Sequence, residues 1–156
     1  MEYSNQFEYA GFWVRLGAAL IDTILFLMLT MPLLYWIYGN YYFESESFIL
    51  GGWDLLLNWL FPFIATVLFW VYRSATPGKI ALKLKVVDAK TGEALSTSKS
   101  ILRYVAYYVS TIPLCLGFIW VAFNGKKQGW HDMIASTVVI RPKDRGVEAV
   151  EFEKRA

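Results

Sequence analysis

Two charged residues of opposite sign, Arg15 and Asp22, lie inside the apolar stretch GFWVRLGAALIDTILFLMLT at residues 11–30. Seven residues are two turns of an α-helix, so both side chains share one helical face, about 10.5 Å apart along the axis. Burial raises the pKa of a carboxyl group, whereas a nearby guanidinium lowers it. A carboxyl group under both influences can exchange a proton for a cation. The pair therefore predicts a functional, titrating site within a membrane segment.

Each of these residues also has a purely structural interpretation. Arg15 lies about one turn from the start of the segment, and its long side chain can reach the lipid headgroups and keep its charge hydrated. Asp22 is expected near the middle of the bilayer, too deep to do the same. A protonated Asp22 can instead bond to a neighbouring helix. The candidate partners for that bond are Asn58, Ser110 and Thr111.

A second polar group lies in QGWHD, residues 128–132. Asp132 can cap the short helix that begins at MIAS, or pair with Arg15 across the cytoplasmic interface. His131 is the only histidine and can act as a pH switch, although an exposed or helix-capping histidine is the simpler interpretation. Asn58, in a later apolar segment, is expected to bond between helices.

The basic residues around position 80 are expected to bind lipid headgroups. TPGK at residues 76–79 lacks the spacing of a phosphate-binding loop and is typical of a turn. Lys79 and Lys83 are placed to bind lipid headgroups, and a merely solvated basic face is the alternative.

Cys115, the only cysteine, is expected to be buried and inert. The sequence has no cysteine cluster, HExxH or GxSxG motif, so it predicts no enzyme, no metal centre and no cofactor.

Three apolar segments must position these residues. They cover residues 12–38, 55–72 and 104–123 of a chain of 156 residues that is 56% hydrophobic. A helical span needs roughly 20 apolar residues. Pro62 is expected to kink the second segment. We expect one membrane domain at residues 1–142, followed by a polar tail at residues 143–156.

The charges between the segments predict an orientation. The connector at residues 39–54 carries acidic residues and no basic one, whereas residues 73–103 carry seven Lys or Arg against two acids. Because basic connectors stay in the cytoplasm, the second connector and the N-terminus are expected to be cytoplasmic. The net charge is only +2, so nucleic acid is not an expected partner.

The third apolar segment has two possible arrangements. ALKLKVVDAKTGEAL at residues 81–95 predicts a strand and a hairpin, and STVVIRP at residues 136–142 predicts another strand. These strands can pair only on one membrane face. That pairing favours a re-entrant hairpin of two half-helices, broken at IPLCLG. A simple third span is the alternative. The fold class is thus an α-helical membrane protein with two full spans, this third segment and a small cytoplasmic sheet.

Three stretches carry a resemblance to a known family. They are YAGFWVRLGAALID at residues 9–22, TPGKIALKLKVVDAKTGEALS at 76–96 and GFIWVAFNGKKQGWHDMIASTVVI at 117–140. The chain resembles the RDD family of small bacterial membrane proteins, named for an arginine and two aspartates. The resemblance implies that Arg15, Asp22 and Asp132 are those three residues. It also implies a protein of the bacterial cytoplasmic membrane, and some relatives are reported as cation/proton antiporters.

Two functions from different classes remain. The first is proton-coupled transport of a cation or small solute past Asp22. Two or three spans enclose a pathway poorly, so transport would require a homo-oligomer. The second is a non-transporting module that binds lipid or other membrane proteins through its spans and its sheet.

Overall fold

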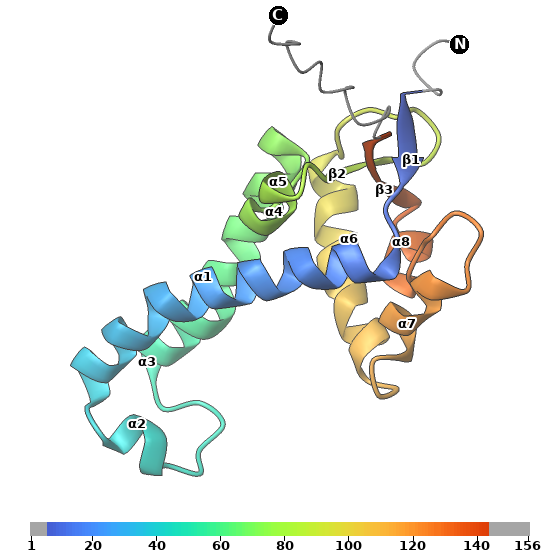
Figure 1. Ribbon diagram of the computed structural model, residues 1–156. Helices are drawn as coiled ribbons and strands as arrows, with labels where there is room; N and C mark the ends of the chain where they lie inside the picture. The colour runs from blue at the N-terminus through green and yellow to red at the C-terminus, as the bar shows by residue number, and fades with distance from the viewer. Residues whose placement is uncertain (1–5, 144–156) are drawn as a thin grey trace, which may run out of the picture.

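The computed structural model describes residues 6–143. It is built around two long apolar helices (Figure 1). The first is α1(Phe12–Tyr38). The second consists of α3(Gly52–Asp54), a π-helical turn at Leu55–Leu60 and α4(Phe61–Arg73). Both are long and apolar enough to cross a membrane, and in each only 11% of the apolar window is buried within the chain. So much exposed apolar surface requires lipid or a protein partner around it.

The π-helical turn at Leu55–Leu60 accommodates Pro62 within the second long helix. Proline has no N–H, and its ring would collide with the carbonyl of residue 58 in a regular α-helix. In the wider turn the N–H of Phe61 bonds to the carbonyl of Leu56. The expected irregularity at Pro62 is therefore present, as a widened turn just before the proline.

The two long helices are joined at the end farthest from the sheet. Gly39 ends α1 with φ +59° and donates its N–H to the Tyr35 carbonyl. The short helix α2(Tyr41–Glu44) follows, and the chain enters α3. Exposed aromatic residues gather here, a composition typical of a membrane–water interface. They include Tyr41, Phe43, Phe48 and Trp53.

A three-stranded antiparallel sheet lies at the other end, with the order β1-β3-β2. Its strands are β1(Phe7–Tyr9), β2(Lys85–Asp88) and β3(Thr137–Pro142). Ile140 of β3 faces Tyr9 on one side and Lys85 on the other. The predicted sheet is confirmed. The expected pairing of β2 with the strand at residues 136–142 is present. The predicted hairpin is wrong, because the chain turns near Gly92 but no strand follows the turn.

The buried core lies between this sheet and the nearby helix ends. Its residues are Ala10, Ala18, Trp70, Leu84, Val86, Leu95 and Val139. The β-branched residues of β3 are buried in the central strand, which favours β3 over the residues after Gly92 as the partner of β2. The core therefore ties the sheet to the first turns of α1 and the last turn of α4.

A short helix, α5(Pro77–Ala81), follows α4 and packs against α1. Ser74, in the left-handed conformation at φ 54°, ends α4 and lets the chain turn back. Gly78 makes the close approach possible, because a Cβ there would collide with the Ala18 carbonyl oxygen and lie 3.0 Å from the Asp22 nitrogen. Backbone atoms cannot move aside as a flexible side chain can, so α5 and α1 touch only because residue 78 is glycine.

The third apolar segment is bent by 110° between α6(Thr97–Thr111) and the helix formed by α7(Leu116–Ile119) and the turn Trp120–Ala122. The bend lies at the predicted break, where Leu114 and Cys115 have positive φ. Cys115 is exposed there, so its expected burial is wrong. The chain then forms α8(Trp130–Ile134), which packs on α6 and leads into β3. Both ends of the bent segment thus connect to the same sheet.

Candidate functional site

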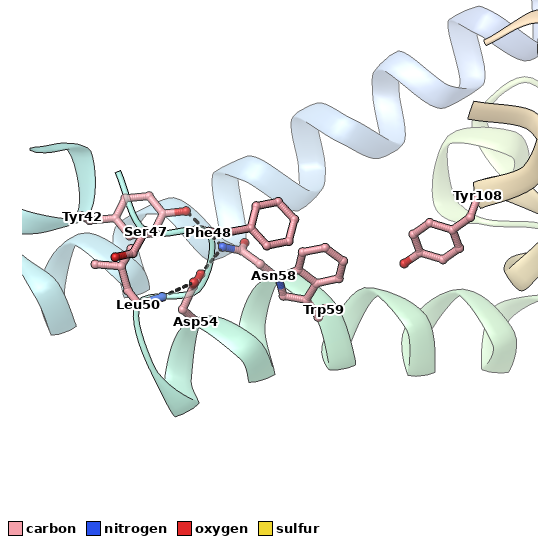
Figure 2. A pocket seen from close by; sticks show the side chains of 8 residues that line it. All are labelled: Tyr42, Ser47, Phe48, Leu50, Asp54, Asn58, Trp59 and Tyr108. Atoms are coloured by element: carbon pink, nitrogen blue, oxygen red, sulfur yellow. Dashed lines mark hydrogen bonds between the residues drawn. The ribbon is translucent and has the colours of Figure 1, made fainter. Parts of the chain in front are cut away.

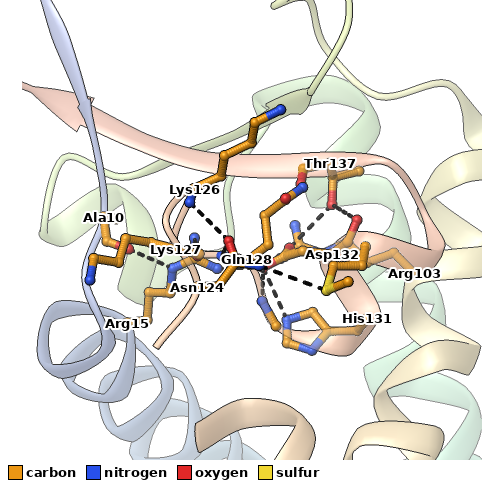
Figure 3. A network of polar contacts seen from close by, with 12 residues as sticks. Ala10, Arg15, Arg103, Asn124, Lys126, Lys127, Gln128, His131, Asp132 and Thr137 are labelled. Carbon is orange, nitrogen blue, oxygen red and sulfur yellow. Dashed lines mark hydrogen bonds and ion pairs between the residues drawn. The ribbon is translucent and has the colours of Figure 1, made fainter. Parts of the chain in front are cut away.

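One buried carboxylate, Asp132, binds two arginines from distant parts of the chain (Figure 3). Its Oδ2 is 2.5 Å from Nη1 of Arg15, and its Oδ1 is 2.6 Å from Nη2 of Arg103. The side chain of Asp132 is 0% exposed, and that of Arg103 is 1% exposed. The cluster joins α1, α6 and α8 at the end of the molecule that carries the sheet.

The first turn of α8 holds Asp132 in place. The carboxylate accepts the N–H of Gly129 at 3.1 Å and the hydroxyl of Thr137, at the start of β3, at 3.1 Å. Capping of the short helix and pairing with Arg15 were alternatives from the sequence. The pairing with Arg15 is confirmed. The helix begins at Trp130 and not at MIAS, so Asp132 lies in its first turn and bonds back to the N–H of Gly129, which precedes the helix. The two oxygens of one carboxylate have room for all four donors.

All three nitrogens of the Arg15 guanidinium bind acceptors within the protein. Besides Asp132, its Nε donates to the Ala10 carbonyl at 2.9 Å, and its Nη2 donates to the Lys127 carbonyl. The side chain is 11% exposed. The expectation that Arg15 reaches outward to headgroups is therefore wrong. Its planar guanidinium instead clamps the start of α1 to the loop before α8.

The electrostatics of the cluster keep Asp132 charged and His131 neutral. Burial alone would raise the pKa of Asp132, but the Arg103 and Arg15 guanidiniums more than offset this and hold the pKa well below its usual range. Burial lowers the pKa of His131 to about 3. Its ring packs against Tyr107 and Phe118, with centroid distances of 4.5 and 4.9 Å. An exposed His131 was the simpler expectation, and it is wrong.

Ser110, His131 and Asp132 follow one another in space as in a hydrolytic triad, but the serine is completely buried. Ser110 Oγ lies 3.1 Å from His131 Nδ1, and His131 Nε2 lies 3.5 Å from Asp132 Oδ2. Ser110 is fully buried, and its Oγ also accepts the His131 backbone N–H. A Cβ at Gly117 would come within 2.6 Å of the Ser110 Cα. Because α7 covers the serine this closely, the arrangement packs α6, α7 and α8 together.

Asp22 binds the segment after the second long helix. Its Oδ2 accepts the Thr76 hydroxyl at 2.5 Å, and its Oδ1 accepts the Gly78 N–H at 2.7 Å. The partners proposed from the sequence, Asn58, Ser110 and Thr111, are wrong. Thr76 and Gly78 reach Asp22 because α5 folds back onto α1 beside it. The carboxylate joins α1 to the first turn of α5.

Lys79 extends this contact into the interior. Its Nζ donates to Thr76 Oγ1 at 3.2 Å, so Asp22, Thr76 and Lys79 form a hydrogen-bonded chain. Lys79 is only 9% exposed, whereas Lys83 is exposed. The two lysines expected to share a headgroup role therefore lie in different environments, one inside the protein and one outside.

Two cavities meet at Lys79. The larger, about 480 Å³, lies between α1 and α4, with apolar walls from residues such as Phe26, Ala65 and Phe69. Asp22, Thr76 and Lys79 form its polar end. A second cavity of about 360 Å³ is lined by Arg15, Lys79, Arg103 and His131 among apolar side chains. Volumes of this size, with apolar walls and few polar groups, are typical of sites for small ligands.

A separate polar pocket lies near the turn between the long helices (Figure 2). Asn58 donates to Asp54 at 2.6 Å and to the Tyr42 hydroxyl at 3.0 Å. Asp54 also accepts the Leu50 N–H at 2.9 Å. Asn58 therefore bonds between helices, as expected from the sequence, and its partner helix is the short α2. The pocket of about 390 Å³ is lined mostly by residues 42–59, which follow the end of α1, whereas Arg15 lies in the first turn of α1.

Comparisons with known proteins identify the family of this chain. The model of the RDD family matches residues 9–136. The chain belongs to the RDD family. It is 35% identical to the uncharacterised protein YxaI of Bacillus subtilis over 147 residues, which cover 84% of this chain and 96% of YxaI. It is 34% identical to the uncharacterised membrane protein YteJ of the same organism, over 86% of this chain and 82% of YteJ.

A third relative matches a shorter stretch. The chain is 40% identical to the uncharacterised protein RP437 of Rickettsia prowazekii over 75 residues, which cover 48% of this chain and 41% of RP437. No solved structure matches. Family membership and the two apolar helices identify a bacterial membrane protein.

The three residues that the resemblance singled out make two separate contacts. Arg15 and Asp132 bind each other, whereas Asp22 binds Thr76 and Gly78. Arg103 was not among the residues predicted from the sequence. Its signal was the helical spacing of Ser100, Arg103, Tyr107 and Ser110, which places them on one face of α6. A buried face that includes an arginine needs a buried carboxylate opposite it.

Proposed function

We propose that this RDD protein is a non-transporting module of the bacterial cytoplasmic membrane that binds a lipid in the cleft between α1 and α4. The observation that carries the proposal is the cleft of about 480 Å³. Its walls come from both apolar helices, and its one polar end is formed by Asp22, Thr76 and Lys79. An amphiphile in a bilayer has the matching division into an apolar chain and a polar head.

The proposed topology follows from the sheet and the charges. We assign α1 and the α3–α4 helix as the two spans, and residues 97–122 as a re-entrant segment. The pairing of β2 with β3 supports this, because the strands on either side of the bent segment share one sheet. The basic connector at residues 73–103 supports a cytoplasmic position for that sheet and for β1.

Binding explains the charges better than cation passage. Each oxygen of Asp22 already accepts a hydrogen bond from the chain, and Asp132 is closed off by two arginines. The cavities are also lined by cations, which repel a passing cation. The cleft is formed by one chain, so the proposal requires no homo-oligomer, no cofactor and no catalytic step.

Filling the cleft tests the proposal. Ala65→Trp would occupy the cleft with an indole, and Ile64→Trp is the matched control, because Ile64 is 44% exposed on the same helix and does not line the cleft. A phospholipid with a photoreactive acyl chain should cross-link to residues that line the cleft, such as Phe26 of α1 and Phe69 of α4, in the wild type and in the control. Monodisperse Ala65→Trp protein should lose these cross-links. Equal cross-linking of all three proteins would contradict lipid binding in the cleft.

A second candidate, proton-coupled cation exchange, is favoured by one observation. Asp22 lines the same cleft, so an entering cation could reach its carboxylate. Exchange through Asp22 requires that the group ionises, and asparagine cannot. Cation-driven proton flux in proteoliposomes that disappears in Asp22→Asn would establish this candidate. Absence of flux in the wild type would leave lipid binding as the function.

A further inference from the structure

We infer that the lipid bound in the α1–α4 cleft is anionic and that Lys79 and Arg103 bind its oxyanion where the two cavities meet. This inference rests on the proposed function and specifies the class of lipid. Four observations lead to it: the balance of charge, the unsatisfied donors of Arg103, the position of Lys79 and the chemistry of the cavity walls.

The buried charges around the cavities do not balance. The cations are Arg15, Lys79 and Arg103, and the carboxylates they face are Asp22 and Asp132. Within residues 6–143 this leaves one positive charge in the cluster. An uncompensated charge in a low-dielectric interior is costly, and a bound anion would remove that cost.

Arg103 has N–H groups that no acceptor in the described part of the chain satisfies. Only its Nη2 binds Asp132, while Nε and Nη1 are buried and have no hydrogen-bond partner in the described part of the chain. Its guanidinium lies 4.8 Å from the centroid of the Trp70 ring. Such stacking uses the face of the guanidinium and leaves the N–H groups at its edge free. Arg103 lines the 360 Å³ cavity, so an acceptor there can satisfy them.

Lys79 is the charged residue among the four that line both this cavity and the cleft; the other three are Ala19, Tyr107 and Phe118. Among residues 6–143 the Lys79 ammonium makes one hydrogen bond, to Thr76. An ammonium group has three hydrogens, so two remain for a ligand. An oxyanion beside Lys79 can therefore face Arg103 on one side while its apolar chain extends between α1 and α4.

The chemistry of the walls selects the ligand. The walls of both cavities are mostly apolar side chains, which exclude a free hydrated anion and accept an acyl chain. One surplus positive charge matches one net negative charge. A phosphodiester with an uncharged alcohol, as in phosphatidylglycerol, has this charge. Phosphatidylcholine has the same phosphodiester, but it brings its own cation and leaves the surplus in place.

Competition between lipids tests the inference. The full chain is incubated with equal amounts of phosphatidylglycerol and phosphatidylcholine that have identical acyl chains, and bound lipid is counted by native mass spectrometry. We expect at least tenfold preference for phosphatidylglycerol. Lys79→Gln should abolish most of that preference. Lys83→Gln, which removes the same charge from the exposed lysine that follows α5, should retain it.

The other outcomes separate this inference from the proposed function. Equal binding of both lipids would overturn the anionic preference and leave lipid binding intact, whereas binding of neither would overturn both. The same loss in Lys83→Gln as in Lys79→Gln would assign the preference to surface charge and overturn the site. Displacement of phosphatidylglycerol by millimolar inorganic phosphate would make the ligand a free anion and also overturn it.

Discussion

Arg103 and Asp132 form an ion pair, with 2.6 Å between Nη2 and Oδ1, in which neither side chain is more than 1% exposed. The pair joins α6, before the bend, to α8, after it. Arg15 adds the start of α1 through the other carboxylate oxygen. A buried pair contributes little net stability when intact, but removal of one partner leaves a buried charge uncompensated. The arrangement of these three helices therefore depends on one carboxylate.

Loss of the Asp132 carboxylate should strongly reduce the free energy of unfolding. Asp132→Asn leaves two guanidiniums without a counter-charge and should reduce the free energy of unfolding by about 3–5 kcal/mol. The matched control is Asp88→Asn, which removes the partner of the partly exposed Lys99 and should cost at most about 1 kcal/mol. Denaturant unfolding in detergent measures both. Similar small losses in the two variants would show that the buried cluster is not a structural requirement.

A methyl group at residue 78 should separate α5 from α1. In Gly78→Ala the new Cβ meets the Ala18 carbonyl oxygen and the Asp22 backbone, and neither can move aside. We expect a loss of about 1–3 kcal/mol from overpacking and from the strained bond to Asp22. Gly125→Ala is the control, because its Cβ would have no atom within 4 Å. Unfolding midpoints that shift equally in both variants would contradict the close contact.

The sheet predicts which residues share a membrane face. Lys90 follows β2, and the Lys143 N–H donates to the Gln6 carbonyl at 2.8 Å beside β1. Cysteines placed at 90 and 143 in a Cys115→Ser background should therefore show the same labelling with an impermeant reagent in intact cells. We expect neither to be labelled until the membrane is opened. Labelling of position 143 alone would mean that residues 97–122 cross the membrane completely.

Burial of His131 should make the protein sensitive to acid. The pKa of His131 is about 3 in the folded chain, compared with 6.5 for a free histidine side chain. Between these pH values only the unfolded state binds the proton, so stability is lost as pH falls from about 6.5 toward 3, by up to about 1.4 kcal/mol per pH unit. His131→Gln lacks this proton site and should show a shallower dependence in detergent unfolding. Identical slopes in the two proteins would mean that His131 is not held neutral.

The long helices were predictable from the sequence because their signal is local. Residues 12–38 are predominantly apolar, with Arg15 and Asp22 as their charged residues, and the predicted bounds of α1 are those observed. The break at IPLCLG and the strand at residues 136–142 are also local patterns, set by Pro113 and by β-branched residues. Each of these elements can therefore be predicted from its own residues alone.

The site depends on partners that are distant in sequence, and this is where prediction failed. Asp22 was expected to bond to Asn58, Ser110 or Thr111, but its partners lie on and just before α5, which returns to α1 only because Gly78 permits the contact. Arg103 was counted as a basic residue that sets orientation, yet it binds Asp132 inside the protein. The pairing of β2 with the strand at residues 136–142 was expected, but the residues after Gly92 were also expected to form a strand beside β2, and they do not.

Native mass spectrometry of the wild-type protein, released from bilayers of natural lipid composition, tests lipid binding most directly. The chain should retain one lipid molecule at collision energies that remove the annular lipids, because that lipid is enclosed between α1 and α4. Ile64→Trp should retain it as well, and Ala65→Trp should not. A wild-type chain that appears without lipid, or that loses its last lipid together with the annular ones, would contradict the account.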